Sequence, residues 1–453
     1  MTISTGIPLL PGPAVNNQSF DSQHAFVAGW VSQPNGRGTF DIVWSSLFTV
    51  FLCTWTSVCL NLPDKDESPL RGVLRRTKWM FWAIVGPEFV VSFAIGQWSS
   101  AQRSVKRFRG RGDLHWTMRH GFFADMGGLL LQPKDSTPFL TNSRQLYYLV
   151  ERGYLACPQL DGDDIWDKSK ADSLARVMTL AQVSWLIIQL IGRAIMRLET
   201  TTLEISAAAI VFSTLGTFYC WFHKPYDVRR PVILNIGVST EQILLDAGED
   251  AKKPYVHTPL DFVAKQSSTV GYDIMGYFGV RFDAKERPLR RLPNDRFPDI
   301  TTTEKFVLFV MTTAYTAVHL VGWNFSFPSN AEQYLWRIAS CILTGVTVLF
   351  WAFETIAARH RFGRWDKYLI WLRFKKEAVR DIEGIETEEE KREREMKESR
   401  PMPLPWEVAL ILPLVIIYLL ARFYMVVEVF LGLRILPLSV FNTVPYIDLI
   451  PHW

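Results

Sequence analysis

The chain has 453 residues, a formal net charge of +4 and 48% hydrophobic residues. Its five cysteines show neither a disulfide framework nor zinc-ligand spacing, which excludes a small domain held together by either. The apolar residues gather into blocks of roughly 20, each long enough to cross the ~30 Å hydrocarbon layer of a membrane as a helix. Charged loops dilute these blocks, so the mean hydropathy is only +0.07. We therefore expect an integral membrane protein in contact with the lipid bilayer and no nucleic-acid partner.

Windows of about 19 residues predict an all-α, polytopic transmembrane helix bundle with about seven spans, within a range of six to eight. Short connections join the third span to the fourth and the fifth to the sixth, so each of these pairs is expected to form a helical hairpin. The predicted spans cover residues 41–60, 79–98, 175–195, 203–222, 305–325, 334–356 and 406–427.

The regions outside the spans divide the chain further. Residues 1–40 form an N-terminal segment, residues 41–356 hold about six spans with large loops at 99–174 and 223–304, and residues 406–453 hold the last span and a tail. Between them, residues 357–405 alternate acidic and basic clusters without an apolar stripe, which is typical of a solvated helix or linker. The stretch His115–Gln132 is apolar but is interrupted by Asp125 and glycines, so we expect it to be interfacial or re-entrant.

Basic residues predict the orientation, because cytosolic loops are enriched in Lys and Arg. The sequence RSVKRFRGRG after the second span has five basic residues and no acidic one, whereas residues 326–333 have no Lys or Arg. This places loops 99–174, 223–304 and 357–405, together with the N-terminus, in the cytosol. One conflict remains, because Arg75, Arg76 and Lys78 then lie in a lumenal loop.

The same topology places the sequon at Asn324 in a lumenal loop, where it is a candidate glycosylation site, and the sequon at Asn17 on the cytosolic side. The N-terminus lacks the pattern of a cleavable signal peptide. We expect a multi-pass protein of the endoplasmic reticulum or another endomembrane.

Ionisable groups inside apolar helices are costly, by about 2.5 to 3.5 kcal/mol on insertion scales, so they mark candidate sites. Glu88 is the foremost candidate, because Pro87 beside it bends a helix and frees a backbone carbonyl. Glu204 and Glu354 are further catalytic candidates, although Glu204 also suits a helix N-terminus. His319 is another intramembrane group, and Arg422 and Glu428 are expected to pair with each other. Asp41 is expected to cap the first span.

An acidic loop before the third span contains a weak metal-binding candidate. Asp163, Asp164 and Asp167 fit the DDxxD pattern with which class I terpene synthases hold magnesium and a diphosphate. Those synthases are soluble helical proteins, and acid-rich loops match the pattern easily, so we predict no metal site. No nucleotide, haem or flavin motif is present, and no cofactor is expected.

Several stretches resemble a large family of fungal polytopic membrane proteins, namely FDIVWSSLFTVFLCTWTSVCLNLP, HGFFADMGG, DKSKADSLARV, LIGRAIMRLETTTLEISAAA, WFHKPYDVRRPV and RFYMVVEVFLGLRILP. Proteins of similar size and span number are membrane terpene cyclases of the ascochlorin and ascofuranone type of meroterpenoid pathway. The resemblance implies such a cyclase, in secondary metabolism, but it supplies no catalytic motif that can be carried over.

The predicted reaction is acid-initiated cyclisation of a prenyl epoxide. Removal from water favours the protonated form of a carboxyl, so Glu88 suits the role of proton donor. Aromatic faces attract a carbocation without trapping it, and the candidate substrate-binding residues are Trp55, Trp82, Trp185, Tyr315 and His319. The substrate would be a hydrophobic prenylated molecule. The alternatives are a transporter or ion channel using the same carboxylates, and a scaffold or receptor acting through residues 357–405; the oligomeric state stays open.

Overall fold

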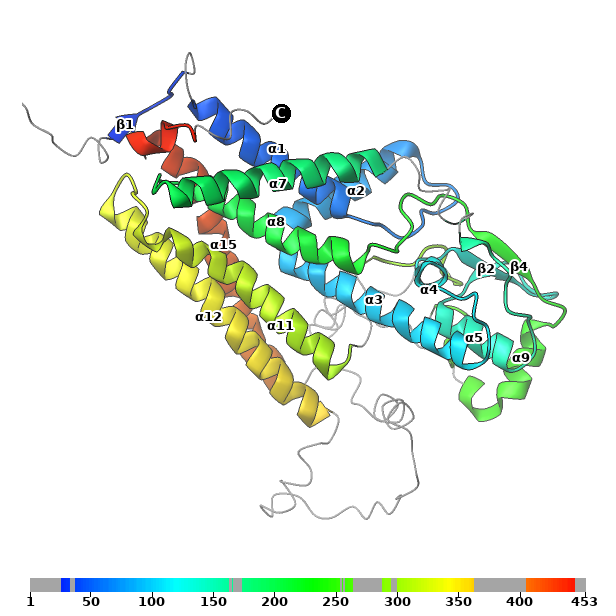
Figure 1. Cartoon of the computed structure of the whole chain (residues 1–453). Helices are drawn as coiled ribbons and strands as arrows, with labels where there is room; N and C mark the ends of the chain where they lie inside the picture. Colours follow the sequence, from blue (N-terminus) through cyan, green and yellow to red (C-terminus); the bar gives the residue numbers. More distant parts are fainter. Residues whose placement is uncertain are drawn as a thin grey trace, which may run out of the picture.

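The computed structural model describes residues 26–32, 37–162, 165, 173–252, 255, 257–263, 287–294, 300–361 and 405–444. It shows a bundle of long helices with a smaller mixed unit at one end (Figure 1). The bundle consists of α1 (Thr39–Ser57), α7 (Ser173–Ile195), α8 (Thr202–Cys220), α11 (Thr302–Ala317) with its 3₁₀ continuation η4 (Val318–Asn324), α12 (Asn330–Arg361) and α15 (Pro405–Leu431). These six are long and apolar enough to cross a membrane, and they match six of the seven predicted spans.

The remaining predicted span, the second at 79–98, is wrong as a single straight helix. The chain instead forms α2 (Pro69–Val85) and α3 (Pro87–Gly110), between which the helix direction bends by 111°. The bend lies at Pro87, which has no N–H to donate and occupies the first position of α3. Gly86 closes α2 by donating its N–H to the carbonyl of Trp82 at 2.8 Å. Hydropathy windows average across such a break and do not detect it.

Both arms of the bent pair lead back to the same end of the bundle. In the first half of α2, Arg76 donates to the carbonyl of Trp55, near the end of α1. Halfway along α3, Ser99 donates to Glu304 at the start of α11, 2.8 Å away. The break itself lies inside the bundle, beside the middle of α15. The α2–α3 pair therefore enters the bundle and returns, as a re-entrant segment does.

The two ends of the bundle differ. The terminal end holds the start of α1 and the C-terminal segment, and the loop end holds the long connections between the helices. At the terminal end, where α1 begins, Arg37 contacts Glu204 at the start of α8, and Arg193 at the end of α7 donates to carbonyls of the C-terminal segment. At the loop end, Thr56 of α1 is bonded to Thr179 of α7 at 3.0 Å. The α2–α3 pair and every long connection between the helices start from the loop end. The prediction of a cytosolic N-terminus depends on a seventh crossing. The α2–α3 pair returns to the loop end, so the start of α1 and the described parts of the long connections lie at opposite ends of the bundle.

A small α/β unit extends the bundle at the loop end (Figure 1). Strand β2 (Leu129–Gln132) is the centre of a sheet, with β3 (Phe139–Leu140) antiparallel on one side and β4 (Val232–Asn235) parallel on the other. The segment 115–132 thus forms the short helix α4 (Met118–Asp125) and β2, inside a core that contains Phe108, Trp116 and Phe123. The remaining elements are α5 (Ser143–Glu151), α9 (Thr240–Ala247) and the 3₁₀ turn η3 (Gly248–Ala251).

A second sheet lies at the terminal end. It pairs β1 (Phe26–Ala28) antiparallel with β5 (Ile435–Pro437), flanked by the 3₁₀ turns η5 (Gly432–Arg434) and η6 (Leu438–Phe441). With these two small sheets the fold is mostly helical, and the all-α prediction is confirmed only for the bundle.

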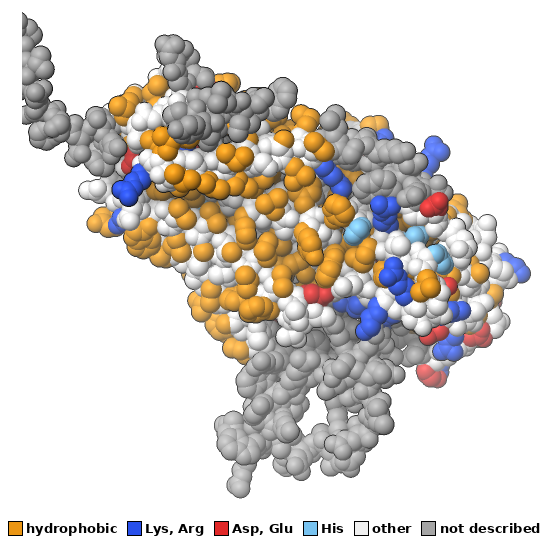
Figure 2. All heavy atoms as spheres, in the orientation of Figure 1, with side chains coloured by type: hydrophobic (Ala, Val, Ile, Leu, Met, Phe, Trp, Pro, Cys, Tyr) orange, Lys and Arg blue, Asp and Glu red, His pale blue; other side chains and the backbone are white. Residues whose placement is uncertain are grey.

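The surface of the bundle is apolar, whereas charges gather on the α/β unit (Figure 2). The long helices expose large apolar side chains along their outer faces, among them Ile188, Val310, Leu349, Ile416 and Leu420. A contiguous apolar surface of this extent is typical of a helix bundle surrounded by lipid.

Candidate functional site

Glu88 lies at the break between α2 and α3, in the first turn of α3. Its Oε1 accepts a hydrogen bond from the hydroxyl of Tyr418, on α15, at 2.7 Å. Its Oε2 is buried and has no hydrogen-bond partner among the described residues. A buried carboxyl oxygen without a partner is rare in folded proteins, because leaving it unsatisfied costs about 1 to 3 kcal/mol, and it calls for a functional explanation.

Arg422 lies one turn after Tyr418 on α15 and forms hydrogen bonds with the end of α2 at the break. Its guanidinium donates to the carbonyls of Ile84 and Val85, both at 3.0 Å, and thereby satisfies the C-terminal end of α2. A third nitrogen lies 3.3 Å from Nε2 of His319. Arginine only donates, so Nε2 of His319 must accept, and its proton is on Nδ1, 3.3 Å from the carbonyl of Thr316.

Aromatic rings surround these polar groups. The guanidinium of Arg422 lies 5.5 Å from the ring centre of Tyr315, whose buried hydroxyl has no hydrogen-bond partner among the described residues. The rings of Tyr315 and His319 are edge to face at 5.8 Å. Trp336 of α12 donates its indole N–H to the carbonyl of His319 at 3.2 Å. We refer to Glu88, Tyr315, His319, Tyr418 and Arg422 as the Glu88 cluster.

The structure thus brings together three of the predicted site residues, Glu88, Tyr315 and His319. Tyr315 and His319 are four residues apart on α11 and η4, so they share one face of the helix, and that face meets α15. Tyr418 and Arg422 have the same spacing on α15. Hydropathy did not single out Tyr418, although its i, i+4 relation to the unusual Arg422 was a usable signal.

Glu204 lies apart from the Glu88 cluster, at the terminal end of the bundle. Its Oε2 accepts from the N–H and the hydroxyl of Thr201, which completes the capping box of α8, and its Oε1 contacts Arg37. Both oxygens are therefore occupied, which supports the structural interpretation of this residue. Asp41 likewise caps α1, accepting from the N–H of Gly38 at 2.7 Å.

The other predicted aromatic and acidic residues are dispersed. Trp55 stacks under Arg76 at 4.5 Å, Trp82 is exposed on α2, and Trp185 is buried beside Val444. Glu354 is half-buried on α12, in its C-terminal half. None of the contacts described for the Glu88 cluster includes them.

Three further predictions concerned an intrahelical ion pair, a glycosylation site and a metal-binding motif. The expected pair of Arg422 and Glu428 is wrong: Glu428 accepts instead from Tyr424 at 3.2 Å, because residues six apart on a helix do not face each other. Asn324 is exposed at the end of η4, and Ser326 of its sequon donates to Glu199 at 2.8 Å. Asp163, Asp164 and Asp167 lie outside the described residues.

Lys224 is a buried cation that the sequence did not identify as important. It follows α8 and donates to the carbonyl of Cys59 at 2.7 Å, to Asn61 at 3.2 Å and to Gln97 at 2.8 Å. Burial lowers the pKa of Lys224 to about 8. These bonds connect the ends of α1 and α8 to α3, so Lys224 positions the returning arm of the α2–α3 pair.

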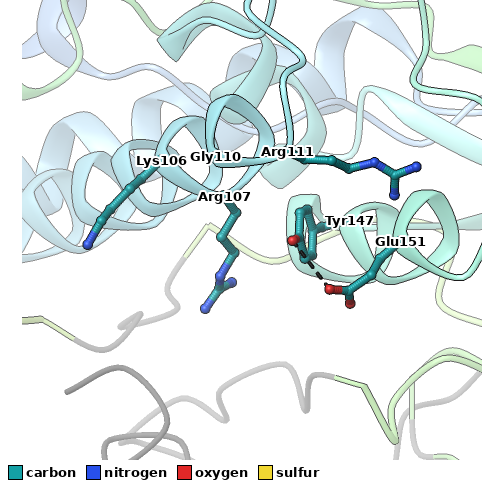
Figure 3. Close-up of a pocket in the computed structure, with 6 residues that line it drawn as sticks. All are labelled: Lys106, Arg107, Gly110, Arg111, Tyr147 and Glu151. Carbon is teal, nitrogen blue, oxygen red and sulfur yellow. Dashed lines mark hydrogen bonds between the residues drawn. The ribbon is translucent and has the colours of Figure 1, made fainter. Parts of the chain in front are cut away.

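Two of the hollows in the described part of the surface lie on the loop-end side. One, of about 470 Å³, lies between α3 and α5 and is bordered by Lys106, Arg107, Arg111, Tyr147 and Glu151. Figure 3 shows their side chains spreading apart, with Tyr147 bonded to Glu151. The other, of about 670 Å³, lies against β2 and β3. Neither is lined by the Glu88 cluster, whose groups are inside the bundle.

Comparison with known proteins gives one match. Neither the curated proteins nor the solved structures include a significant relative of this chain. Residues 14–247 and 301–453 match a family of unknown function, which covers the bundle helices, the α2–α3 pair and every member of the Glu88 cluster. The chain therefore belongs to this family of unknown function, DUF8562.

Proposed function

We propose that this protein is a membrane-bound terpene cyclase that acts on a prenyl-epoxide meroterpenoid intermediate, with Glu88 as the acid. The observation that carries the proposal is Oε2 of Glu88, which is buried at a helix break beside Tyr418 and has no hydrogen-bond partner in the described part of the chain. Such an oxygen is free to carry a proton and to give it to a substrate atom.

The chemistry needs one proton and no oxidant. The carboxyl of Glu88 protonates the epoxide oxygen, the C–O bond at the more substituted carbon breaks, and a carbocation forms. The electron pair of a neighbouring phenol or alkene forms the new bond to that carbon. The oxonium formed from a phenol then loses its O–H proton, or the carbocation formed from an alkene loses an adjacent C–H proton, and this proton restores the carboxyl of Glu88. The product is an isomer of the substrate. Tyr418 holds Glu88 in place at 2.7 Å, and Arg422 stabilises the carboxylate left after proton transfer.

The surroundings of the cluster suit a hydrophobic substrate. The outer faces of the bundle are apolar, so a prenylated molecule dissolved in the bilayer can approach from the side without a soluble carrier. The bundle helices exclude water, and a dry site protects a carbocation from premature capture. The expected location is the endoplasmic reticulum or a related endomembrane, where such substrates partition.

The test is product formation in membranes. Microsomes from a fungal host that expresses the chain are given farnesylated phenolic epoxides, and products are separated by mass-resolved chromatography. We expect a new isomer of unchanged mass, formed by the wild type and by Glu354→Gln but not by Glu88→Gln. Glu354→Gln is the matched control because it removes a second predicted acid of a bundle helix. Unchanged epoxide in wild-type membranes, despite correct insertion, would count against a cyclase.

A transporter is the second candidate, and the broken α2–α3 pair favours it. In many transporters, broken helices place their ends near the middle of the bilayer, where they bind ions or substrates. Here the end of α2 is already satisfied by Arg422, which leaves Glu88 as the available ligand. Proteoliposomes under a proton gradient distinguish the two functions: Glu88-dependent proton or solute flux, without product formation, would establish the transporter.

A further inference from the structure

Three side chains with metal-ligating atoms converge outside the bundle, in the α/β unit. Asp113 and His115 lie in the connection between α3 and α4, and Cys157 lies in the segment after α5. Their ligand atoms all lie within 4.8 Å of one another. These three residues come from two chain segments more than forty positions apart, which is why no sequence spacing revealed them.

The geometry of the group suits a tetrahedral ion. The Sγ of Cys157 and the Nε2 of His115 are 3.5 Å apart. Zinc bonds of ~2.3 Å to sulfur and ~2.05 Å to nitrogen at a tetrahedral angle place these two atoms about 3.6 Å apart. A thiol hydrogen bond to the imidazole gives a similar separation, so the third residue is decisive. Oδ2 of Asp113 is buried and meets no hydrogen-bond geometry among the described residues; its charged neighbour is Nε of Arg111, 4.0 Å away.

The loop is held in this arrangement by its own backbone. The N–H of Asp113 donates to the carbonyl of Phe108 at 3.1 Å, and the N–H of Trp116 donates to the carbonyl of Asp113 at 3.2 Å. Trp116 is fully buried and stacks on Phe108 at 4.1 Å. Asp113 and His115 therefore lie on a preformed turn that is fixed to the end of α3. Arg111 lies 4.0 Å from Asp113 and balances part of its charge.

We propose that Asp113, His115 and Cys157 bind a zinc ion and leave a fourth position open to water or to a small ligand. One thiolate, one imidazole and one carboxylate form a ligand set that zinc accepts, and three protein ligands are typical of a site with an exchangeable position. Zinc uptake displaces the thiol proton, so binding strengthens as the pH rises. The site is independent of the Glu88 cluster and of the proposed cyclase activity.

The test uses the purified full chain in detergent, stripped with chelator and then titrated with Co²⁺, whose absorption reports thiolate ligation. We expect a thiolate-to-cobalt band in the near ultraviolet that is displaced by Zn²⁺, and one zinc per chain by elemental analysis. Cys157→Ser and His115→Gln should lose the band and the zinc. Cys341→Ser, which removes an exposed cysteine of α12, should keep both.

Two results would overturn the site. The first is a wild-type protein that elutes as a folded monodisperse species and shows no thiolate band. The second is a band that persists in Cys157→Ser, which would place the cobalt on another cysteine. Because the first result needs no variant, misfolding of a variant cannot obscure it.

Discussion

Replacing Arg422 with Leu should destabilise the bundle strongly, because this side chain satisfies the end of α2 inside the protein. The variant removes charged-donor bonds to the carbonyls of Ile84 and Val85, each 3.0 Å long. Hydrogen bonds of this type contribute about 1.5 to 3 kcal/mol each, so the loss is about 3 to 6 kcal/mol. At ~2 °C per kcal/mol, as for a domain of 150–250 residues, the apparent melting temperature should fall by about 6 to 12 °C.

The measurement is the melting of a fluorescent-protein fusion in detergent, followed by size-exclusion chromatography after heating. Arg337→Leu is the matched control: Arg337 also donates to a backbone carbonyl, that of Trp323 at 2.8 Å, but it lies on the bundle surface, where solvent replaces it. Its melting temperature should stay within about 2 °C of the wild type. An Arg422→Leu protein as stable as this control would refute the role given to Arg422.

Three other predictions concern Lys224, the orientation of the bundle and Glu204. Lys224→Met should lower stability by at least about 2 kcal/mol, since it leaves buried acceptors unpaired. The pKa of Lys224 is about 8 in the folded state and 10.5 in the reference state. Between these pH values the unfolded chain binds more protons, so the stability of the wild type should rise with pH in that window. Melting curves at stepped pH should show this rise for the wild type but not for Lys224→Met. A glycosylation tag should be modified at the N-terminus and stay unmodified within residues 362–404, contrary to the cytosolic N-terminus expected from seven spans. Glu204→Gln should weaken thermal stability in detergent by about 1 to 3 kcal/mol, through loss of the Arg37 contact, without affecting product formation.

The orientation that underlies the glycosylation-tag prediction also resolves the conflict between the basic residues of α2 and a lumenal first loop. Arg75, Arg76 and Lys78 lie on α2, whose first half contacts the end of α1 at the loop end. They therefore lie on the same side as RSVKRFRGRG and the other basic loops. Under the rule that basic loops are cytosolic, six crossings would place these basic segments in the cytosol and the start of α1 and the end of α15 in the lumen, which is what the glycosylation tag tests.

Hydropathy alone located the bundle helices, because each apolar block is long and continuous. It missed the break at Pro87, since a window average does not register a single residue without an N–H. It also missed β2, because a short apolar run such as Leu129–Leu131 does not distinguish strand from helix. The partner strand β4 is about one hundred residues further along the chain, so no local pattern indicates the pairing.

Part of the Glu88 cluster was predictable for a physical reason. Charged or polar side chains inside apolar blocks are costly, so Glu88 and His319 stood out individually. Their partners depend on which faces of α11 and α15 meet, and that is a tertiary property. Arg422 was therefore assigned to the nearest acidic residue in the sequence, Glu428, when its contacts come from α2 and η4.

The most direct test of the central claim asks whether Glu88 is a protonated carboxyl that a lipid-soluble molecule can reach. A hydrophobic carbodiimide reacts with protonated carboxyl groups from within the bilayer, and peptide mass spectrometry locates the adduct. For the protein in native membranes we expect an adduct at Glu88, reduced by a prenylated substrate analogue and absent from Glu88→Gln. An adduct at Glu88 that forms only after the protein is unfolded would contradict the claim, because it would show a carboxylate sealed in an ion pair with Arg422.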